Sequence, residues 1–244
     1  MDSILDFFRS YGLQILLTAV ISYLLGSISF SILFTKKFEK TDIRKMGSGN
    51  AGFTNVLRSV GILPAILTLV GDFGKGVVAV LIGRLIFQSF SLAQIAPYEV
   101  TQYGTYLAGF CCLMGHIFPC YFGFKGGKGV LTTAAMILLI DWRVFLLVLA
   151  VFALVFVCSR IISLSSIIAA ALYPVCTFLV TYFIDYRPNR ALPTSEFTLH
   201  YVVIVTAISF IVGVVIVVKH RENIKRILNG TEKKITPKKH NKNA

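Results

Sequence analysis

The stretch Gly47-Ser48-Gly49-Asn50-Ala51-Gly52-Phe53-Thr54-Asn55-Val56-Leu57-Arg58 is a polar, glycine-rich segment set between long apolar runs. Its glycines allow the backbone to turn tightly and to point several N–H groups toward one place. Its hydroxyl and amide groups and the guanidinium of Arg58 suit the binding of phosphate. We expect Thr54 to Arg58 to lie at the start of a helix, where anions are favoured. The alternative is a flexible connector on a membrane protein.

The composition around this segment is that of a membrane protein. Of the 244 residues, 56% are hydrophobic and 14% are charged, and the mean hydropathy is +0.77. Several apolar runs approach or exceed the ~20 residues that a helix needs to cross the hydrocarbon core of a bilayer. The runs are continuous rather than alternating, so the predicted class is an all-α polytopic membrane protein. The first run, residues 11–34, is too long for a cleaved signal peptide and is expected to remain as a membrane helix.

The runs predict about seven transmembrane helices, with the N-terminus outside and the C-terminus in the cytoplasm. A version with about five crossings, in which short runs are interfacial or re-entrant, keeps the same ends. The two versions differ at residues 61–90, which a polar insertion interrupts, and at residues 130–158, which Asp141-Trp142-Arg143 divides. Residues 185–198 form an expected outer loop. In both versions residues 1–230 form a single integral membrane domain, and residues 231–244 form a basic cytoplasmic tail that is expected to be flexible.

The net charge of +13 is concentrated in two places. Basic residues crowd the first loop, residues 36–58, and the C-terminal segment, residues 219–242. The positive-inside rule places both on the cytoplasmic side. Attraction to anionic lipid headgroups explains the charge better than a nucleic-acid partner does, because the rest of the chain lies in lipid.

Two further polar segments have chemistry similar to that of the first. Phe124-Lys125-Gly126-Gly127-Lys128-Gly129 follows the third apolar run, and His220-Arg221-Glu222-Asn223 follows the last one. In the predicted topology both face the cytoplasm, and so do residues 160–163. With the first segment they gather cations, hydroxyls, amides and an imidazole beside the membrane. That inventory suits a phosphate-bearing substrate.

Other residues narrow the chemistry. Residues 125–129 do not form a Walker loop, because the spacing to an earlier glycine is wrong and Gly129 replaces the Ser or Thr. A basic turn that anchors the following helix is the structural alternative. Asp72 and Lys75 are costly within an apolar run, and we expect them to pair and to shape the site. The sequence has no metal-ligand spacing, haem motif or nucleotide motif, so we expect neither a metal nor a cofactor.

Taken together, the motifs resemble the three signature segments of the bacterial acyl-phosphate:glycerol-3-phosphate acyltransferases, the PlsY family. The similarity rests on residues 47–58, on Gly115-His116-Ile117-Phe118-Pro119 with residues 124–129, and on His220-Arg221-Glu222-Asn223-Ile224. Lesser similarities occur in the same order at residues 26–28, at Asp72 with Lys75-Gly76, and at residues 160–166. The resemblance covers most of residues 20–232.

The resemblance implies a multi-pass enzyme of the bacterial plasma membrane, expected to be a monomer among membrane lipids, with its active site on the cytoplasmic face. It would move a fatty acyl group from acyl phosphate to the 1-hydroxyl of glycerol 3-phosphate, giving lysophosphatidic acid and inorganic phosphate. The residues that match catalytic positions are Ser48, Arg58, Lys128, His220 and Asn223. The residues expected to bind substrate are Gly47, Gly49, Asn50, Thr54, Asn55, Lys125, Gly126, Gly127, Arg160, Ser163, Ser166, Asp72 and Lys75.

These residue types fit the implied reaction. Arg58 and Lys128 would hold phosphate groups and stabilise charge on the leaving phosphate. Ser48 and Asn223 would orient the attacking hydroxyl. The backbones expected to cradle phosphate oxygens are those of Gly47, Gly49, Gly126 and Gly127.

Two groups could accept the proton of the attacking hydroxyl. Acyl phosphate is already activated and its own oxygens could take the hydroxyl proton, in which case His220 positions the substrate. Alternatively His220 is the general base, the usual role of an imidazole near neutral pH. His116, close to Pro119 at a helix end, is expected to be structural. A covalent acyl-enzyme on Ser48 is disfavoured, because nothing in the sequence supplies its base.

The chain departs from the family pattern in a few places. Ala51 and Phe53 stand where the family more often has Pro and Ala, and Ser29 replaces a usual Pro. The bulk of Phe53 is expected to narrow the pocket or to alter the choice of acyl chain. The alternative function is a membrane transporter or binding protein for a phosphorylated small solute. That alternative predicts two related halves and charges deep in the helices, and of these only Asp72 and Lys75 are found.

Overall fold

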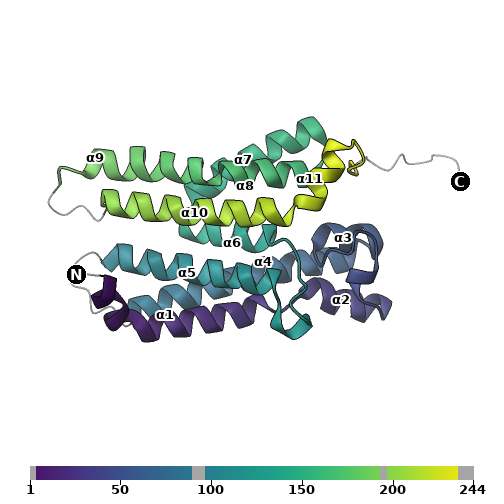
Figure 1. The fold of residues 1–244 in the computed structure, drawn as a ribbon, viewed down its shortest axis with the longest axis horizontal. Coiled ribbons are helices and arrows are strands. Elements are labelled where there is room, and N and C mark those ends of the chain that lie inside the picture. The colour runs from purple at the N-terminus through teal and green to yellow at the C-terminus, as the bar shows by residue number, and fades with distance from the viewer. Residues whose placement is uncertain (1–3, 90–96, 193–196, 236–244) are drawn as a thin grey trace, which may run out of the picture.

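The computed structural model describes residues 4–89, 97–192 and 197–235, and these residues form an all-helical fold (Figure 1). The elements in chain order are α1 (Ile4–Gly26), α2 (Phe30–Glu39), η1 (Ile43–Lys45), α3 (Phe53–Ser59), α4 (Ile62–Ser89), α5 (Pro97–Ile117), η2 (Cys120–Phe122), α6 (Val130–Ile140), α7 (Trp142–Ser159), α8 (Ile162–Phe178), η3 (Leu179–Tyr186), α9 (Arg187–Asn189), α10 (Leu199–Lys219) and α11 (Arg221–Leu228).

Six helical stretches among the described residues are long and apolar enough to cross a membrane. They are Arg9–Glu39, Ile62–Ser89, Tyr98–Phe122, Trp142–Ser159, Ile162–Asn189 and Leu199–Lys219. The remaining apolar run of the predicted seven, Val130–Ile140, forms α6, which has 11 residues and is shorter than the six stretches above. The helical membrane class is therefore confirmed, whereas the number of crossings and the orientation of the termini stay predictions.

Residues 62–89 form one continuous helix, α4, in spite of the polar insertion at residues 71–76. Two glycines of the insertion lie where neighbouring side chains leave no room for a Cβ atom. A side chain at Gly71 would overlap the ring of Phe30, and one at Gly76 would meet Ala135 Cβ at 2.9 Å. The two charges in the insertion neutralise each other, since Asp72 and Lys75 are one turn apart and their charged atoms lie 3.0 Å from each other. The continuous helix favours one crossing by residues 62–89 over a short re-entrant helix in this part of the chain.

Helices α1 and α5 pack closely at two glycines. A side chain at Gly26 would overlap the backbone of Cys112, and one at Gly115 would overlap the backbone of Tyr23 and of Ser27. The small residues at this contact let the two helix backbones approach closely. The contact also fixes the end of α5, from which the second polar loop leaves.

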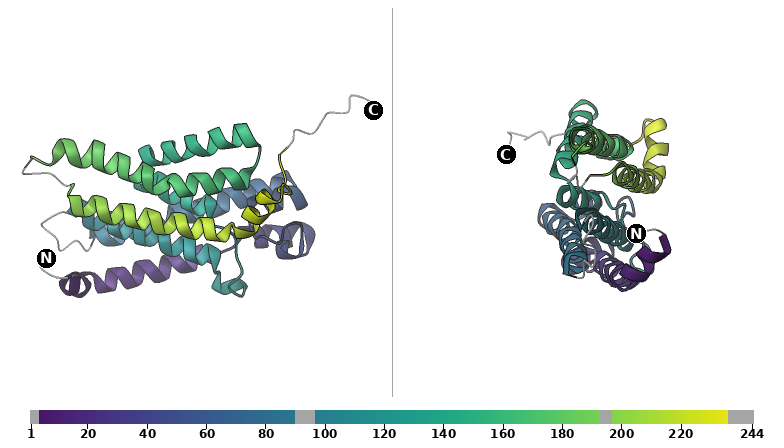
Figure 2. Two further views of the ribbon diagram at one scale, coloured as in Figure 1. Left: turned by 45° about the horizontal axis from the view of Figure 1, so that its top comes forward. Right: turned by 90° about the vertical axis from the view of Figure 1, so that its left-hand side faces the viewer.

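The helices form two groups that meet along α6. Helix α5 packs against α1, α4 and α6, while α8 packs against α7 and α10, and α6 also contacts α7 (Figure 2). Figure 1 shows α2, α3 and α11 together at one end, while the described start of α1 and helix α9 lie at the other. The polar segments of the sequence therefore gather at a single end of the bundle.

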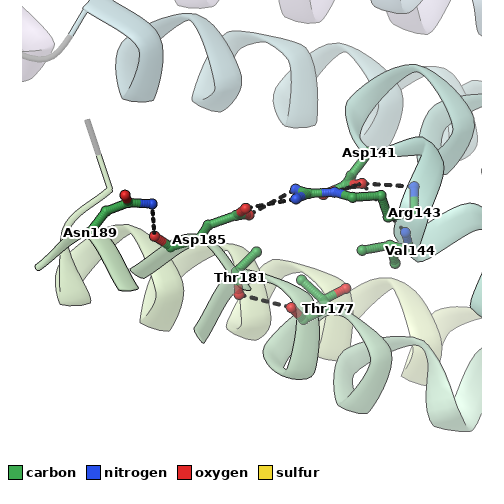
Figure 3. A network of polar contacts seen from close by, with 7 residues as sticks. All are labelled: Asp141, Arg143, Val144, Thr177, Thr181, Asp185 and Asn189. Atoms are coloured by element: carbon green, nitrogen blue, oxygen red, sulfur yellow. Dashed lines mark hydrogen bonds and ion pairs between the residues drawn. The ribbon is translucent and has the colours of Figure 1, made fainter. Parts of the chain in front are cut away.

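The opposite end is joined by an ionic network shown in Figure 3. The guanidinium of Arg143 bonds Asp141 Oδ2 at 2.7 Å and Asp185 Oδ1 at 2.7 Å, and the Asp185 carbonyl accepts from Asn189 Nδ2 at 2.8 Å. Because Asp185 is held in this way, the helix continues past it to Asn189. The expectation that the outer loop begins at residue 185 is wrong by several residues. Residues 193–196 of that loop lie outside the described residues.

Candidate active site

Asn55 organises the first glycine-rich segment. This residue is 4% exposed, and its side-chain oxygen accepts from the backbone N–H of Ser48 at 3.0 Å. Its side-chain nitrogen lies 3.2 Å from the carbonyl of Ile43 and 3.0 Å from the carbonyls of Met46 and Asn50. The amide is thus occupied by the loop, so Asn55 shapes the turn on which Ser48 is carried.

The expected helix after this turn is present but short. Residues Phe53–Ser59 form α3, and a second helix, α4, starts after Gly61. Thr54 is half-buried in the first turn of α3, and Arg58 is exposed in its last turn. The flexible-connector alternative does not fit a segment so densely bonded.

The Lys-Gly-Gly-Lys loop is fastened to the end of α5 and to the first segment. The N–H groups of Gly126 and Gly127 donate to the carbonyls of Ile117 and His116 at 3.1 and 3.2 Å. A side chain at Gly127 would overlap the carbonyl of Ala51 and the ring of His116. These two glycines are therefore needed for close packing of the two loops.

Three of the four glycines expected to cradle phosphate use their N–H groups within the protein. Gly126 and Gly127 spend their N–H groups on α5, and Gly49 donates its N–H to the carbonyl of Met46 at 3.0 Å. Gly47 and Gly49 have φ of 55° and 72°, the left-handed values that glycine accepts readily. These glycines therefore shape the loops, and the backbone cradle for phosphate stays a prediction.

Lys128 meets Asn223 across the bundle. The ammonium of Lys128 donates to Asn223 Oδ1, although the two residues are 95 positions apart. Lys128 directly precedes Gly129 and α6, and Asn223 lies in the first turn of α11, where it is 5% exposed. The structure thus brings the second and third signature segments into direct contact.

Burial and charge depress the basicity of Lys128. Burial lowers its pKa from 10.5 to about 8, against the opposing effect of Glu232 and with the help of Arg226, Arg58 and Lys219. Arg58 of the first signature segment is among the cations that lower this pKa. A lysine whose pKa is close to neutral pH, inside a cluster of cations, is typical of a functional site.

His220 forms the corner between α10 and α11 and is 3% exposed. Its Nδ1 lies 2.8 Å from the carbonyl of Ile216. A carbonyl only accepts, so Nδ1 carries the proton and Nε2 carries the lone pair. Burial, and then the charge of Lys128, lower the pKa of His220 to about 4. The imidazole is therefore neutral at physiological pH and weakly basic.

Residues 231–235 cross the same end of the bundle. Ser163 Oγ and Asn223 Nδ2 both donate to Glu232 Oε1 at 2.7 Å, and Arg226 Nε donates to Glu232 Oε2 at 2.6 Å. Arg58 Nη2 donates to the carbonyl of Lys233 at 3.3 Å, and the N–H of Ile235 donates to the carbonyl of Arg160 at 2.8 Å. Glu232, Lys233 and Ile235 are therefore bonded to the helical bundle, while the flexibility of the tail stays a prediction. Residues 236–244 lie outside the described residues.

Asp72 and Lys75 pair as expected, and His116 joins them. Lys75 Nζ lies 3.0 Å from His116 Nδ1 and donates to the carbonyl of Ile28 at 2.7 Å. Lys75 and His116 are 5% and 6% exposed, and the backbone carbonyl of His116 accepts the N–H of Gly127. The buried group therefore lies next to the attachment of the second loop, and a structural role for the His116 side chain stays a prediction.

Four further predicted residues are Ser48, Lys125, Arg160 and Ser166. Ser48 and Lys125 are exposed, and Lys125 offers its carbonyl to Arg44 Nη1 at 3.1 Å. Arg160 ends α7 with φ of 60° and is exposed. Ser166 is buried, and its hydroxyl bonds the carbonyl of Ile162 at 3.0 Å.

An apolar cavity opens between α6, α7, α8 and α10. Residues from each helix line it, among them Val130, Phe152, Ser166, Tyr173 and Ile216. Val130 is two residues from Lys128, and Ile216 is four residues from His220. The cavity lining therefore comes within two residues of Lys128 along the chain, and α7, α10 and the helical stretch that starts with α8, which bound it, are long and apolar enough to cross a membrane.

Sequence reasoning missed three contributors to this site. Glu232 and Arg226 were counted only as part of a basic C-terminal segment, and Arg44 only as part of a basic loop. Arg44 Nη1 donates to the carbonyl of Phe122 at 2.6 Å and so ties the first loop to the second. A carboxylate within a run of cations, as at residue 232, was the available signal for Glu232.

The chain was compared with known proteins. The family model described as glycerol-3-phosphate acyltransferase matches residues 16–230. A glycerol-3-phosphate acyltransferase of Jannaschia sp. (strain CCS1) is 38% identical over 219 residues, which cover 90% of this chain and 92% of that protein. One of Clostridioides difficile (strain 630) is 38% identical over 224 residues, covering 92% and 97%.

Solved structures give the same result. The crystal structure of PlsY (YgiH), an integral membrane glycerol 3-phosphate acyltransferase, in its glycerol 3-phosphate form has a TM-score of 0.68 and 31% sequence identity, and covers 91% of this chain and 96% of that one. Its lysophosphatidic acid form has a TM-score of 0.67. The resemblance drawn from the three signature segments is thereby confirmed. The chain belongs to the glycerol-3-phosphate acyltransferase family of integral membrane enzymes.

Proposed function

We propose that this enzyme transfers a fatty acyl group from acyl phosphate to the 1-hydroxyl of glycerol 3-phosphate, giving lysophosphatidic acid and inorganic phosphate. The observation that carries the proposal is the convergence of Lys128, Asn223, Ser163 and Arg58 from four separate elements at one end of the bundle. Cations and neutral donors in one partly buried place suit a phosphate dianion. The solved relatives named for glycerol 3-phosphate and lysophosphatidic acid support the same acceptor and product.

The apolar cavity supports the acyl half of the proposal. Its lining includes Val130, two residues after Lys128, and α7, α10 and the helical stretch that starts with α8, which bound it, are long and apolar enough to cross a membrane. A fatty chain in this cavity would place its acyl phosphate head at the polar cluster. The fatty chain could then stay in the apolar cavity throughout the acyl transfer.

The transfer is proposed to be direct. The 1-hydroxyl oxygen attacks the acyl carbonyl carbon, the bond from that carbon to the phosphate oxygen breaks with its electron pair leaving on phosphate, and the hydroxyl proton passes to a phosphate oxygen. Lys128 and Arg58 stabilise the charge on the departing phosphate. His220 with a pKa of about 4 is a poor general base at neutral pH, so its proposed role is to accept a hydrogen bond at Nε2 and to position substrate.

The proposed location is the bacterial plasma membrane, with the site on the cytoplasmic face and the protein acting as a monomer. The basic residues of α2, η1, α11 and the segment after it support this orientation, because they gather at the same end as the site (Figure 1). The described start of α1 lies at the opposite end, which fits an N-terminus outside.

The test uses the full chain purified in detergent. Phosphate release from acyl phosphate should require glycerol 3-phosphate, and acyl-CoA or an acylated carrier protein should not replace the donor. Turnover with acyl-CoA but not with acyl phosphate would refute the proposed donor. Uptake of glycerol 3-phosphate into vesicles without acyl transfer would favour the transporter alternative.

A further inference from the structure

Glu232 is an acidic residue held inside a cluster of cations. Its side chain is 7% exposed, and its carboxylate receives bonds from Ser163, Asn223 and Arg226. These donors come from the start of α8 and from the first and second turns of α11, whereas Glu232 itself follows α11. One carboxylate therefore links three parts of the chain at the proposed phosphate site.

The bond to Glu232 fixes which way the Asn223 amide points. The side-chain nitrogen of Asn223 donates to Glu232 Oε1, so the oxygen at the other end of the amide faces the ammonium of Lys128. An ammonium has donors and no acceptor, so only this orientation gives Lys128 a partner in Asn223. A rotated amide would turn its N–H groups toward Lys128 and its oxygen toward a carboxylate.

We propose that Glu232 is a positioning residue of the active site, which holds Asn223 and Ser163 in place and, through Asn223, sets the position and charge of Lys128. The proposal rests on the assignment of Lys128 and Asn223 to the acyl transfer reaction. Glu232 is not a catalytic residue in this scheme, because its contacts are to protein groups.

The charges around Lys128 give the proposal a second consequence. The groups that act on the ammonium are Glu232 after α11, Arg226 on α11, Arg58 on α3 and Lys219 on α10, with His220 neutral beside them. Of these, Glu232 favours the charged form of Lys128, while burial and the three cations oppose it. Glu232 is itself ionised at neutral pH: burial opposes its ionisation, but the bonds from Ser163, Arg226 and Asn223 hold its pKa below the usual value. Loss of this carboxylate should therefore move the pKa of Lys128 further down.

The contacts also suggest the opposite effect, which the test must separate from the proposal. Ser163 and Asn223 are expected to bind phosphate, yet both give a bond to Glu232. If Glu232 competes with phosphate for these donors, its removal would tighten substrate binding instead of weakening it. The direction of the change in KM for glycerol 3-phosphate decides between the two roles.

The experiment compares Glu232→Gln with Glu222→Gln in the full-length enzyme in detergent. Glu222 is a matched control on α11, because it is 61% exposed and its ion pairs with Arg221 and Lys225 are long, at 3.6 Å. Initial rates are measured against glycerol 3-phosphate and against pH. We expect Glu232→Gln to lower kcat/KM by about tenfold to a hundredfold, the range for lost bonds to a charged group. The alkaline limb of its pH profile should move to lower pH, whereas Glu222→Gln should match the wild type in both respects.

Glu232→Asp keeps the negative charge with a shorter side chain and serves as the conservative variant. It should lose activity through displaced bonds while keeping the alkaline limb near that of the wild type, and it carries the test if Glu232→Gln does not fold. A lower KM in Glu232→Gln would overturn the positioning role in favour of competition. Unchanged kcat/KM and an unchanged pH profile would overturn it outright. Failure of the wild type itself to use acyl phosphate would refute the proposed function and not this inference.

Discussion

The ammonium of Lys128 donates a hydrogen bond to the side-chain oxygen of Asn223, and this bond joins the loop before α6 to the first turn of α11. The bond directly links two signature segments whose residues are 95 positions apart in the chain. Asn223 and Ser163 both donate a hydrogen bond to Glu232. Arg58 donates to the carbonyl of Lys233, the residue after Glu232, and its positive charge lowers the pKa of Lys128. The predictions below depend on this convergence.

Replacement of either cation should remove activity without unfolding the protein. Lys128→Ala or Arg58→Ala should lower kcat/KM for acyl transfer by about a hundredfold or more, because charge on the leaving phosphate would lose its partner. Lys37→Ala, at an exposed position in the last turn of α2, is the control for a general loss of positive charge. Rates in the two site variants that equal those of the control would exclude the proposed site.

Activity should fall as pH rises through about 8. Burial and neighbouring cations bring the pKa of Lys128 to about 8, so the ammonium is present below this pH and is lost above it. The measurement is log kcat/KM against pH with saturating acyl phosphate. In Lys128→Arg the charge persists at high pH, so any remaining activity should lack the alkaline limb. An unchanged limb in that variant would assign the titration to another group.

His220→Gln should retain appreciable activity. The imidazole is neutral with a pKa of about 4, and a glutamine side chain also offers an acceptor and a donor at similar reach. We expect a loss of less than about a hundredfold, the lower end of what an essential general base supplies. Complete inactivity of a folded His220→Gln protein would restore His220 as the base.

The buried pair of Asp72 and Lys75 should matter for stability. Asp72→Asn leaves the charge of Lys75 buried without its partner, and should cost about 3 to 5 kcal/mol of unfolding free energy. The double variant Asp72→Asn with Lys75→Met should recover part of that loss, since the stranded charge is gone. Thermal denaturation in detergent provides the comparison. A double variant less stable than Asp72→Asn would contradict the account.

The network of Figure 3 should affect stability and leave catalysis unchanged. Asp185→Asn weakens the bonds from Arg143, whose side chain is 32% exposed, and should cost about 1 kcal/mol because solvent screens the pair in part. Asp185 lies in η3 directly before α9, and Figure 1 shows α9 at the end of the bundle opposite α11. A change in KM for glycerol 3-phosphate would show that the two ends are coupled.

The sequence by itself determined the helical membrane class and the family. Length and continuity of the apolar runs decide the class, because a backbone in lipid must satisfy its hydrogen bonds internally. The family follows from local order: Gly47 to Arg58, the loop with Lys128 and the segment with His220 each keep their motif within a few residues. The pairing of Asp72 with Lys75 was also predictable, because residues three apart on a helix lie on one face.

Only the tertiary structure decided how the site is held together. Asn55, Gly126 and Gly127 belong to the signature motifs of the sequence. In the structure, however, the side-chain amide of Asn55 bonds to carbonyls of its own loop, and the N–H groups of the two glycines bond to carbonyls of α5. Glu232 has no motif around it and gains its place from Ser163, which is 69 positions away, and from Asn223. Hydrogen bonds between distant segments depend on how helices pack, and packing is set by the whole bundle rather than by a local pattern. For that reason the sequence predicted the kinds of residue in the proposed site, but not the hydrogen bonds between distant segments that hold them together.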